Sequence, residues 1–277
     1  EWFDAALAED RFSTWFQPIV DTNGHRLVGH ECLIRLQAER LYSGAEIVGA
    51  AGIRGEIHAF DSHARRLAIR SAARQSRQGV YFINFMPASI YNPDRCMKSA
   101  ADAVGAAGMN RENIVFEVPE SDLASDPAHL RRICDYFRRE GFGFALGGVG
   151  CGSGNGADTL QNVCDLQPNY IKLDKALVRN VEQPVHAAAI RQLVELSDRF
   201  GVGVIAEGVE RRHTMENLWL LGVECMQGFL FGRPSARIAS CGDGRDIASL
   251  GRSIQSAGTA AVPVFTTPRG YESALFR

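Results

Sequence analysis

The sequence predicts an α/β fold, a TIM-like (β/α)8 barrel whose first strand runs antiparallel to the second. Apolar segments typical of buried strands recur along the chain, and amphipathic helical segments separate them. The dipeptide Asn23-Gly24 predicts a tight turn, so the first two strands should form a hairpin. About eight strand-like segments within the first ~235 residues fit a closed barrel better than an open sheet.

The strand segments are short runs of aliphatic, β-branched and aromatic residues, as expected for strands buried on both faces. The predicted strands are Phe16–Asp21, Arg26–Ile34, Val80–Asn84, Ile114–Val118, Phe142–Leu146, Tyr170–Leu173, Val202–Glu207 and Cys225–Phe229. The longer predicted helices between them are Ala59–Gln75, Arg95–Ala107, Pro127–Glu140 and Val185–Phe200. We expect a barrel domain over residues 1–235. Residues 236–277 are rich in Gly, Ser, Ala and Thr and are expected to be a C-terminal extension or capping segment.

The composition is that of a globular protein, with 277 residues, 45% hydrophobic, 22% charged and a net charge of −2. Without a basic field we expect neither a nucleic-acid polymer nor membrane contact. No segment approaches the ~20 apolar residues of a membrane span, and no signal-peptide pattern is present. Seven scattered cysteines include no CxxC pair, which favours reduced thiols in the cytoplasm. We expect the chain to be a domain of a longer protein.

Polar residues lie near the ends of several predicted strands. They are Glu31, Asn84, Glu117, Lys172, Glu207 and Gln227. Any one of them also fits an ordinary strand end that faces solvent. In a barrel, however, the carboxyl ends of the strands meet at one mouth, so all these side chains should converge there. Three carboxylates, two amides and a lysine at one mouth are typical of a divalent-metal phosphoester site.

These residues lie in motifs whose order and spacing resemble the EAL-type cyclic di-GMP phosphodiesterase domain, over roughly Phe3 to Pro234. The motifs are Phe16-Gln17-Pro18-Ile19-Val20, Glu31-Cys32-Leu33-Ile34-Arg35, Glu117-Val118-Pro119-Glu120-Ser121, Lys172-Leu173-Asp174, Ala206-Glu207-Gly208-Val209-Glu210 and Gln227-Gly228. The resemblance implies a metal-dependent phosphodiesterase barrel in bacterial signalling.

The resemblance also implies roles for individual residues. The residues implied to contact the nucleotide are Gln17, Glu31, Leu33, Arg35, Asp61, Asn84, Glu210 and Gln227. Those implied to bind Mg or Mn are Glu31, Asn84, Glu117 and Glu207. Lys172 and Glu207 match catalytic positions, and Glu120 matches a glutamate that steadies the loop beside the metal site.

One departure from the family decides what activity to expect. The family carries Asp-Asp-Phe-Gly after the strand Phe142–Leu146, and here the positions read Gly147-Gly148-Val149-Gly150. Glycine has no side-chain oxygen for a metal, and Mg²⁺ sites depend on carboxylates. We therefore expect Lys172 and Glu207 not to support hydrolysis, and the domain to be a degenerate, non-catalytic cyclic di-GMP receptor that needs no cofactor for binding.

Two alternatives stay open at this point. One is a protein-interaction module that no longer binds the nucleotide, whose partners would be other signalling domains or proteins. The other is a residual phosphodiesterase with a rebuilt metal site, which would use Mg or Mn. A homodimer is a further candidate partner, because the loop at this position contributes to the dimer interface in the family.

Other patterns point to chemistry less strongly. Gly152-x-Gly154-x-x-Ala157 matches a degenerate dinucleotide fingerprint, but its glycines stand several residues beyond the strand. His58 and His63 are five residues apart, which is not the spacing of a helical zinc site. The arginine pairs Arg131-Arg132 and Arg138-Arg139 are expected on the exposed face of a helix.

Overall fold

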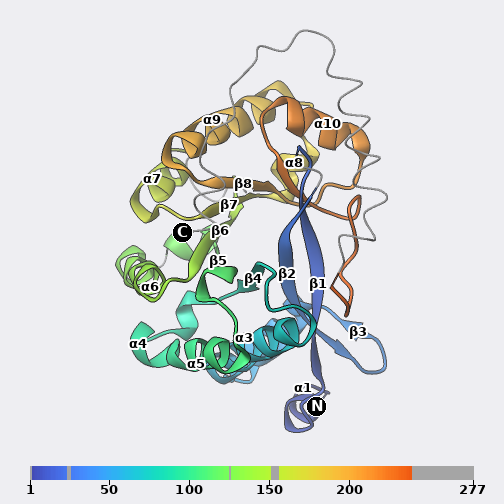
Figure 1. Ribbon diagram of the computed structural model, residues 1–277, viewed down its shortest axis with the longest axis vertical. Helices are drawn as coiled ribbons and strands as arrows, with labels where there is room; N and C mark the ends of the chain where they lie inside the picture. Colours follow the sequence, from blue (N-terminus) through green and yellow to red (C-terminus); the bar gives the residue numbers. More distant parts are fainter. Residues whose placement is uncertain (1, 24–25, 125, 151–155, 239–277) are drawn as a thin grey trace.

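The computed structural model describes residues 2–23, 26–124, 126–150 and 156–238. Eight strands close into a barrel, which confirms the predicted fold class (Figure 1). The strands are β1 (Phe12–Asp21), β2 (Arg26–Gln37), β3 (Leu41–Tyr42), β4 (Tyr81–Asn84), β5 (Ile114–Pro119), β6 (Gly143–Val149), β7 (Tyr170–Leu173), β8 (Gly203–Ala206) and β9 (Cys225–Gln227). The short strand β3 lies outside the closed ring, at the edge of β2.

The first strand closes the barrel in the antiparallel sense, as predicted. Strand β1 pairs antiparallel with β2 over its whole length, from Phe12 opposite Leu36 to Asp21 opposite Arg26. On its other edge β1 pairs antiparallel with β9, with Ile19 opposite Gln227. Every other neighbouring pair in the ring is parallel.

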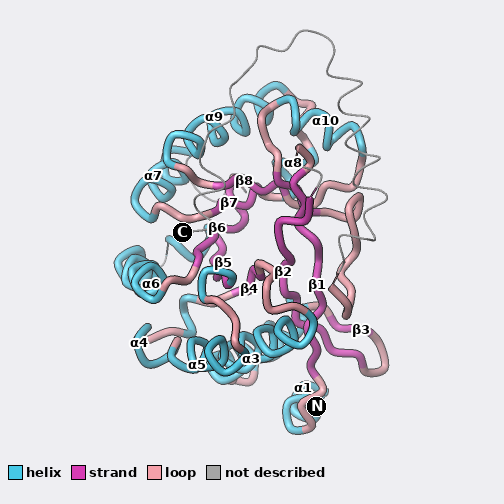
Figure 2. Tube along the Cα trace, viewed as in Figure 1, coloured by secondary structure: helices cyan, strands magenta, loops and turns pink. Residues whose placement is uncertain are grey.

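Helices cover the ring of strands on most of its outer side, and loops lie beside β1 (Figure 2). The α-helices are α1 (Trp2–Ala8), α2 (Gly44–Ile53), α3 (Ile57–Gln75), α4 (Pro93–Cys96), α5 (Lys98–Ala107), α6 (Pro127–Glu140), α7 (Gly156–Leu166), α8 (Lys175–Arg179), α9 (Pro184–Phe200) and α10 (Arg212–Leu220). The 3-10 helices are η1 (Pro87–Ser89), η2 (Arg111–Asn113) and η3 (Glu120–Ala124). The largest apolar cluster lies between strands and helices, where Phe116 stacks on Phe137 of α6.

The chain around β1 contains elements that the sequence pattern did not reveal. Helix α2 begins at a capping box, in which Ser43 and Glu46 each accept a hydrogen bond from the other's backbone. Both β1 and β2 are longer than predicted because they run beyond the barrel and pair there. The predicted helix Arg95–Ala107 is two helices, α4 and α5, with Met97 between them.

Strand β6 is also longer than predicted, and this changes where its glycines lie. The predicted strand ended at Leu146, whereas β6 continues to Val149. Gly147 pairs with Pro119 of β5, so it belongs to the sheet and not to the following loop. Gly148 has a φ of +69°, in the left-handed region that glycine adopts without steric cost. The strand's irregular pairing with β7 falls at these glycines.

After Pro234 the chain contacts the barrel again over residues 235–238. Ser235 forms an antiparallel bridge with Phe16 of β1, and the Ile238 backbone N–H donates a hydrogen bond to Gln75 Oε1 of α3 at 2.7 Å. The rest of the predicted C-terminal segment, 239–277, lies outside the described residues. Across the described ranges, no helix combines the length and apolar character needed to cross a bilayer. The cysteines described are free thiols.

Candidate ligand and metal site

A layer of apolar side chains fills the barrel interior, and a layer of polar side chains lies next to it, toward the carboxyl ends of the parallel strands. Its buried members, from the strands β1 and β4 to β9 and the residue before β4, are Ile19, Val80, Phe82, Val115, Ala145, Tyr170, Ile205 and Cys225, and the partly buried Val28 of β2 packs against them. Side chains alternate along a strand, so the residue two positions on points into the barrel as well. That step leads from Val115 to Glu117, from Tyr170 to Lys172 and from Cys225 to Gln227. The same step from Ala145 leads to Gly147.

Lys172 lies at the centre of the polar layer and contacts three carboxylates. Its side chain is fully buried, and Nζ lies 2.6 Å from Glu117 Oε2, 2.6 Å from Glu207 Oε1 and 3.1 Å from Glu31 Oε2. Burial by itself lowers the pKa of Lys172, but the surrounding carboxylates more than reverse this and hold its pKa well above the ordinary value. Lys172 is therefore a permanent cation within this cluster.

Glu31 is the most extensively bonded of the three carboxylates. Asn84 Nδ2 donates to its Oε1 at 3.0 Å, and Gln227 Nε2 donates to its Oε2 at 2.6 Å. Burial opposes ionisation of Glu31, but the charge of Lys172 and these hydrogen bonds outweigh it and lower its pKa to about 2. Gln227 also donates to Gln17 Oε1 at 3.2 Å, so Gln17 reaches the same network through an amide.

Glu117 behaves in the opposite way. Burial raises the pKa of Glu117 to about 8, with the negative charges of Glu31 and Glu207 adding to the effect and Lys172 opposing it. Two buried glutamates, on β2 and β5 with β4 between them, thus differ in charge preference because Glu31 has three donors and Glu117 has mainly Lys172. The structure brings together all six strand-end side chains that we expected to converge.

The place of the family's first aspartate lies beside this cluster. A Cβ added to Gly147 would stand 2.7 Å from Glu117 Oε1, so any side chain at this position enters the carboxylate cluster. A Cβ at Gly148 would meet nothing within 4 Å. Glycine at 147 therefore adds no carboxylate to this cluster, and glycine at 148 offers no side-chain oxygen either.

The remaining donors can be tested against a divalent metal by their chemistry. One carboxylate oxygen each from Glu31, Glu117 and Glu207 lies within 4.8 Å of the others, which suits a single hard cation. The ammonium of Lys172 contacts the same three groups, so a cation has to compete with it. A two-metal centre needs carboxylates that clamp both ions, and the glycines at 147 and 148 supply none. The residues fit one ion and do not fit two.

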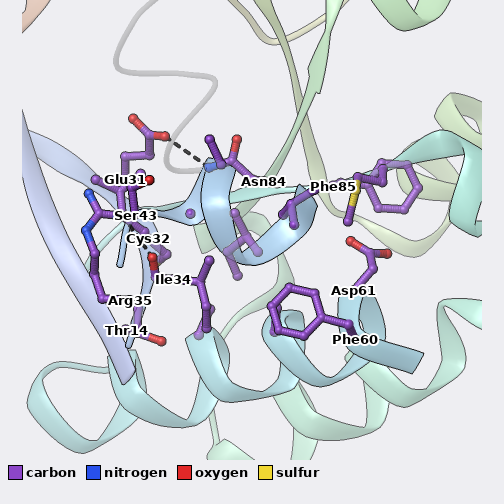
Figure 3. A pocket seen from close by; sticks show the side chains of 18 of the residues that line it. Thr14, Glu31, Cys32, Ile34, Arg35, Ser43, Phe60, Asp61, Asn84 and Phe85 are labelled. Atoms are coloured by element: carbon purple, nitrogen blue, oxygen red, sulfur yellow. Dashed lines mark hydrogen bonds between the residues drawn. The ribbon is translucent and has the colours of Figure 1, made fainter. Parts of the chain in front are cut away.

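A cavity of about 430 Å³ opens beside this cluster, between β2, α2 and α3 (Figure 3). Five of the residues predicted to contact a nucleotide line it: Glu31, Leu33, Arg35, Asp61 and Asn84. Arg35 and Asp61 lie toward opposite ends of the cavity, with Phe60 below (Figure 3). Its size and its mixture of apolar walls with a few polar groups are typical of small-molecule sites.

The other predicted contacts lie outside the cavity lining. Gln17 and Gln227 belong to the hydrogen-bond network of Glu31. Glu210 is exposed and pairs with Arg179 at 3.3 Å, so the structure does not bring it to the cavity. Sequence reasoning missed the wall formed by α2 and the start of α3, including Ser43 and Phe60. The signal for α2 was present in the capping-box spacing of Ser43 and Glu46.

Glu120 contacts both ends of the glycine-rich segment that follows β6. Its Oε2 accepts a hydrogen bond from the Gly150 backbone N–H at 3.2 Å, and its Oε1 accepts one from Thr159 Oγ1 at 2.5 Å. Residues 151–155, with the glycines of the predicted dinucleotide fingerprint, lie outside the described residues. The structure thus places Glu120 where the loop leaves the strand and where α7 follows.

The remaining candidate patterns have ordinary structural partners. His58 Nδ1 lies 2.7 Å from the Ser89 carbonyl oxygen, and His63 Nε2 lies 3.2 Å from Asp10. The arginines of α6 form surface ion pairs, Arg131 with Asp165, Arg138 with Asp135 and Arg139 with Asp94.

Comparison with known proteins agrees with this geometry. The family model described as EAL domain matches residues 1–234, so the chain belongs to the EAL domain family. Cyclic di-GMP phosphodiesterase RocR of Pseudomonas aeruginosa is 32% identical over 123 residues, which cover 44% of this chain and 30% of that protein. The chain thus corresponds to only a part of the length of this curated relative.

Solved structures agree in fold. A standalone EAL protein from Vibrio cholerae, in its c-di-GMP-bound form, superimposes with a TM-score of 0.75 at 30% identity, covering 83% of this chain and 94% of that one. The manganese and cyclic di-GMP complex of BlrP1 from Klebsiella pneumoniae gives a TM-score of 0.75 at 26% identity, covering 83% of this chain and 57% of that one.

Proposed function

We propose that this domain is a non-catalytic receptor for cyclic di-GMP in bacterial signalling. The observation that carries the proposal is that Gly147 stands where the family motif has an aspartate, beside a cluster in which the single cation Lys172 contacts three carboxyl groups. With no carboxylate at 147 or 148, the two-metal arrangement that would activate water lacks its ligands. The fold and the cavity beside it are nevertheless complete.

The cavity supports binding without metals. Arg35 lines it, and a guanidinium suits a phosphate because it donates two parallel hydrogen bonds. Its Nη1 donates to the neighbouring Ile34 carbonyl at 2.8 Å, and no other described residue forms a hydrogen bond with this guanidinium, so its remaining nitrogens can serve a ligand. The relatives in the solved complexes bind cyclic di-GMP, and the cavity residues Glu31, Leu33, Arg35, Asp61 and Asn84 are the contacts that the family motifs imply. We also propose that Glu120 restrains the segment after β6.

The test is calorimetric titration of cyclic di-GMP into the domain, once with EDTA and once with Mg²⁺ or Mn²⁺. We expect binding of similar affinity in both buffers. Chromatography of the same samples should show no linear product. Turnover near ~1 s⁻¹, the lower end of usual enzyme rates, refutes the non-catalytic proposal, provided that Glu31→Ala abolishes it and so excludes a contaminant.

A second outcome would favour the protein-interaction module. If cyclic di-GMP gives no heat and no thermal stabilisation in either buffer, the cavity is not a receptor for it. Binding that appears only with the metal would instead favour the rebuilt metal site formed by Glu31, Glu117 and Glu207.

A further inference from the structure

A separate apolar cluster outside the barrel joins helix α1 to the wall of the cavity. Its buried members include Phe3 of α1, Ile47 of α2 and Phe60 of α3. Val48 and Ala64 are partly buried and pack against the same cluster. Phe60, Val48 and Ala64 also line the cavity. The cluster therefore has members both in α1 and in the cavity wall.

Phe60 is the residue at which α1 and the cavity meet. The centre of its ring lies 5.6 Å from that of Phe3 and 5.3 Å from that of Phe12, and the residue is 1% exposed. Figure 3 shows its ring at the lower side of the cavity. Removal of Phe3 takes away one of the two aromatic rings that pack on Phe60 within the described part of the chain. A buried ring that loses such contacts is held less firmly in one position.

Helix α1 is a short element that can leave its position without unfolding the barrel. It is seven residues long, and an isolated helix of that length is unstable in water. Phe3 buries its inner face, and Trp2 stacks on Tyr42 of β3 with ring centres 4.3 Å apart. An ion pair of Asp4 with Arg54, at 2.7 Å, joins half-exposed side chains and adds little. Elements held by so few contacts open locally at a lower free energy than the whole domain unfolds.

We propose that Phe3 is a positioning residue for the ligand cavity: docked α1 holds Phe60 in the cavity wall, and a bound ligand in turn holds α1 in its docked position. This inference rests on the proposed receptor function. Coupling between two sites is reciprocal, so the factor by which docking of α1 raises ligand affinity equals the factor by which the ligand stabilises the docked helix. Any contact that detaches α1 then lowers the affinity of the receptor, which makes α1 a point of regulation.

The first measurement is calorimetric titration of cyclic di-GMP into the wild type and four variants. Phe3→Ala and Trp2→Ala both release α1, and Trp2 does not line the cavity. The affinity should fall about fivefold in each, the lower end of typical coupling between sites. Phe3→Leu keeps an apolar side chain and should recover most of the affinity. Phe142→Ala is the matched control, because Phe142 is similarly buried but belongs to the main apolar cluster, and its affinity should equal that of the wild type.

The second measurement is amide hydrogen exchange of α1 in the wild type, with and without saturating cyclic di-GMP. By reciprocity the ligand should slow exchange of the α1 amides by about the same fivefold factor. In Phe3→Ala these amides should exchange fast, and the ligand should slow them less. This measurement on the wild type depends on no variant and reports on α1 itself.

Thermal unfolding of each variant separates a loss of stability from a loss of affinity. Folded Phe3→Ala with a lower Tm and the affinity of the wild type has lost packing alone, which overturns the positioning role and leaves the receptor proposal intact. Unchanged exchange of α1 on ligand binding, or an equal loss of affinity in Phe142→Ala, overturns it as well. If Phe3→Ala does not fold, Trp2→Ala and the exchange of the wild type decide. A wild type that binds no cyclic di-GMP overturns both proposals.

Discussion

Gly147 is the position where one added side chain tests the metal interpretation most directly. A Cβ there stands 2.7 Å from Glu117 Oε1 and 3.3 Å from its Cγ, and both belong to a flexible side chain that can shift. Gly148 is less suitable, because its φ of +69° costs most side chains about 1–2 kcal/mol. We therefore choose Gly147→Asp, with Gly147→Asn as a control of the same size and no charge.

The expected magnitude follows from the charges around this position. The carboxyl group nearest to the new aspartate is that of Glu117, whose pKa is already raised to about 8. Two like charges about 4 Å apart near a protein surface repel by about 4 kcal/mol, so protonation of Glu117 and attraction to Lys172 offset a large part of this. In EDTA we expect Gly147→Asp to be about 1–3 kcal/mol less stable than Gly147→Asn. A divalent ion present at 100 times its Kd raises the free energy of unfolding by about 2.7 kcal/mol. For a domain of this size that is a rise in Tm of about 5–11 °C.

The assay is thermal unfolding of both variants in EDTA and across a Mn²⁺ titration, followed by analysis of cyclic di-GMP for linear product. Metal-dependent stabilisation should be clearly larger in Gly147→Asp than in Gly147→Asn, which has only the three glutamates for an ion. Product formation should stay low, because position 148 still lacks an oxygen ligand. If the two variants are equally stable in EDTA and neither responds to Mn²⁺, position 147 does not belong to the carboxylate cluster and the reasoning is refuted.

Two further predictions concern single charges. Arg35→Ala should weaken cyclic di-GMP binding about tenfold, since a charge-assisted phosphate contact is worth about 1.5–3 kcal/mol. Arg40→Ala, at an exposed arginine paired with Glu46, should leave this affinity unchanged. Equal losses of affinity in calorimetry for the two variants would remove Arg35 from the ligand contacts. Lys172→Met should cost about 3–5 kcal/mol in urea unfolding because it leaves buried carboxylates without their cation. Lys98→Met, at an exposed lysine, is the control, and an unchanged midpoint in Lys172→Met would contradict the central role of that ammonium.

The parts of the molecule that the sequence predicted are those controlled by local periodicity. Buried strands reveal themselves as apolar runs, and the two-residue repeat then assigns Glu117, Lys172 and Gln227 to the barrel interior. The antiparallel hairpin was predictable because the turn at Asn23 has a strong conformational preference of its own. Convergence at one mouth follows from closure of the barrel and needs no knowledge of side-chain contacts.

The parts that escaped prediction depend on contacts between distant segments. Nothing near Asp61 in the sequence indicates that Ser89, from η1, completes its hydrogen bonds. The extension of β2 to Gln37 depends on pairing with Phe12 and its neighbours, which lie in another strand. The ion pair between Glu210 and Arg179 likewise joins the loop after β8 to the end of α8, which only the tertiary fold brings together. Such contacts leave no periodic pattern in the amino-acid sequence from which they could be predicted.

The antiparallel closure by β1 has a consequence for how the chain reaches its fold. The two glutamines that meet where β1 joins β9 are separated by 210 positions. At synthesis rates of about 5–20 residues per second, roughly 10–40 s pass between the emergence of Gln17 and that of Gln227. During this interval the hairpin of β1 and β2 has one edge without its final neighbour, open to pairing with another nascent chain. The Pro18 in β1 lies on that strand and limits such pairing, since it has no backbone N–H to donate.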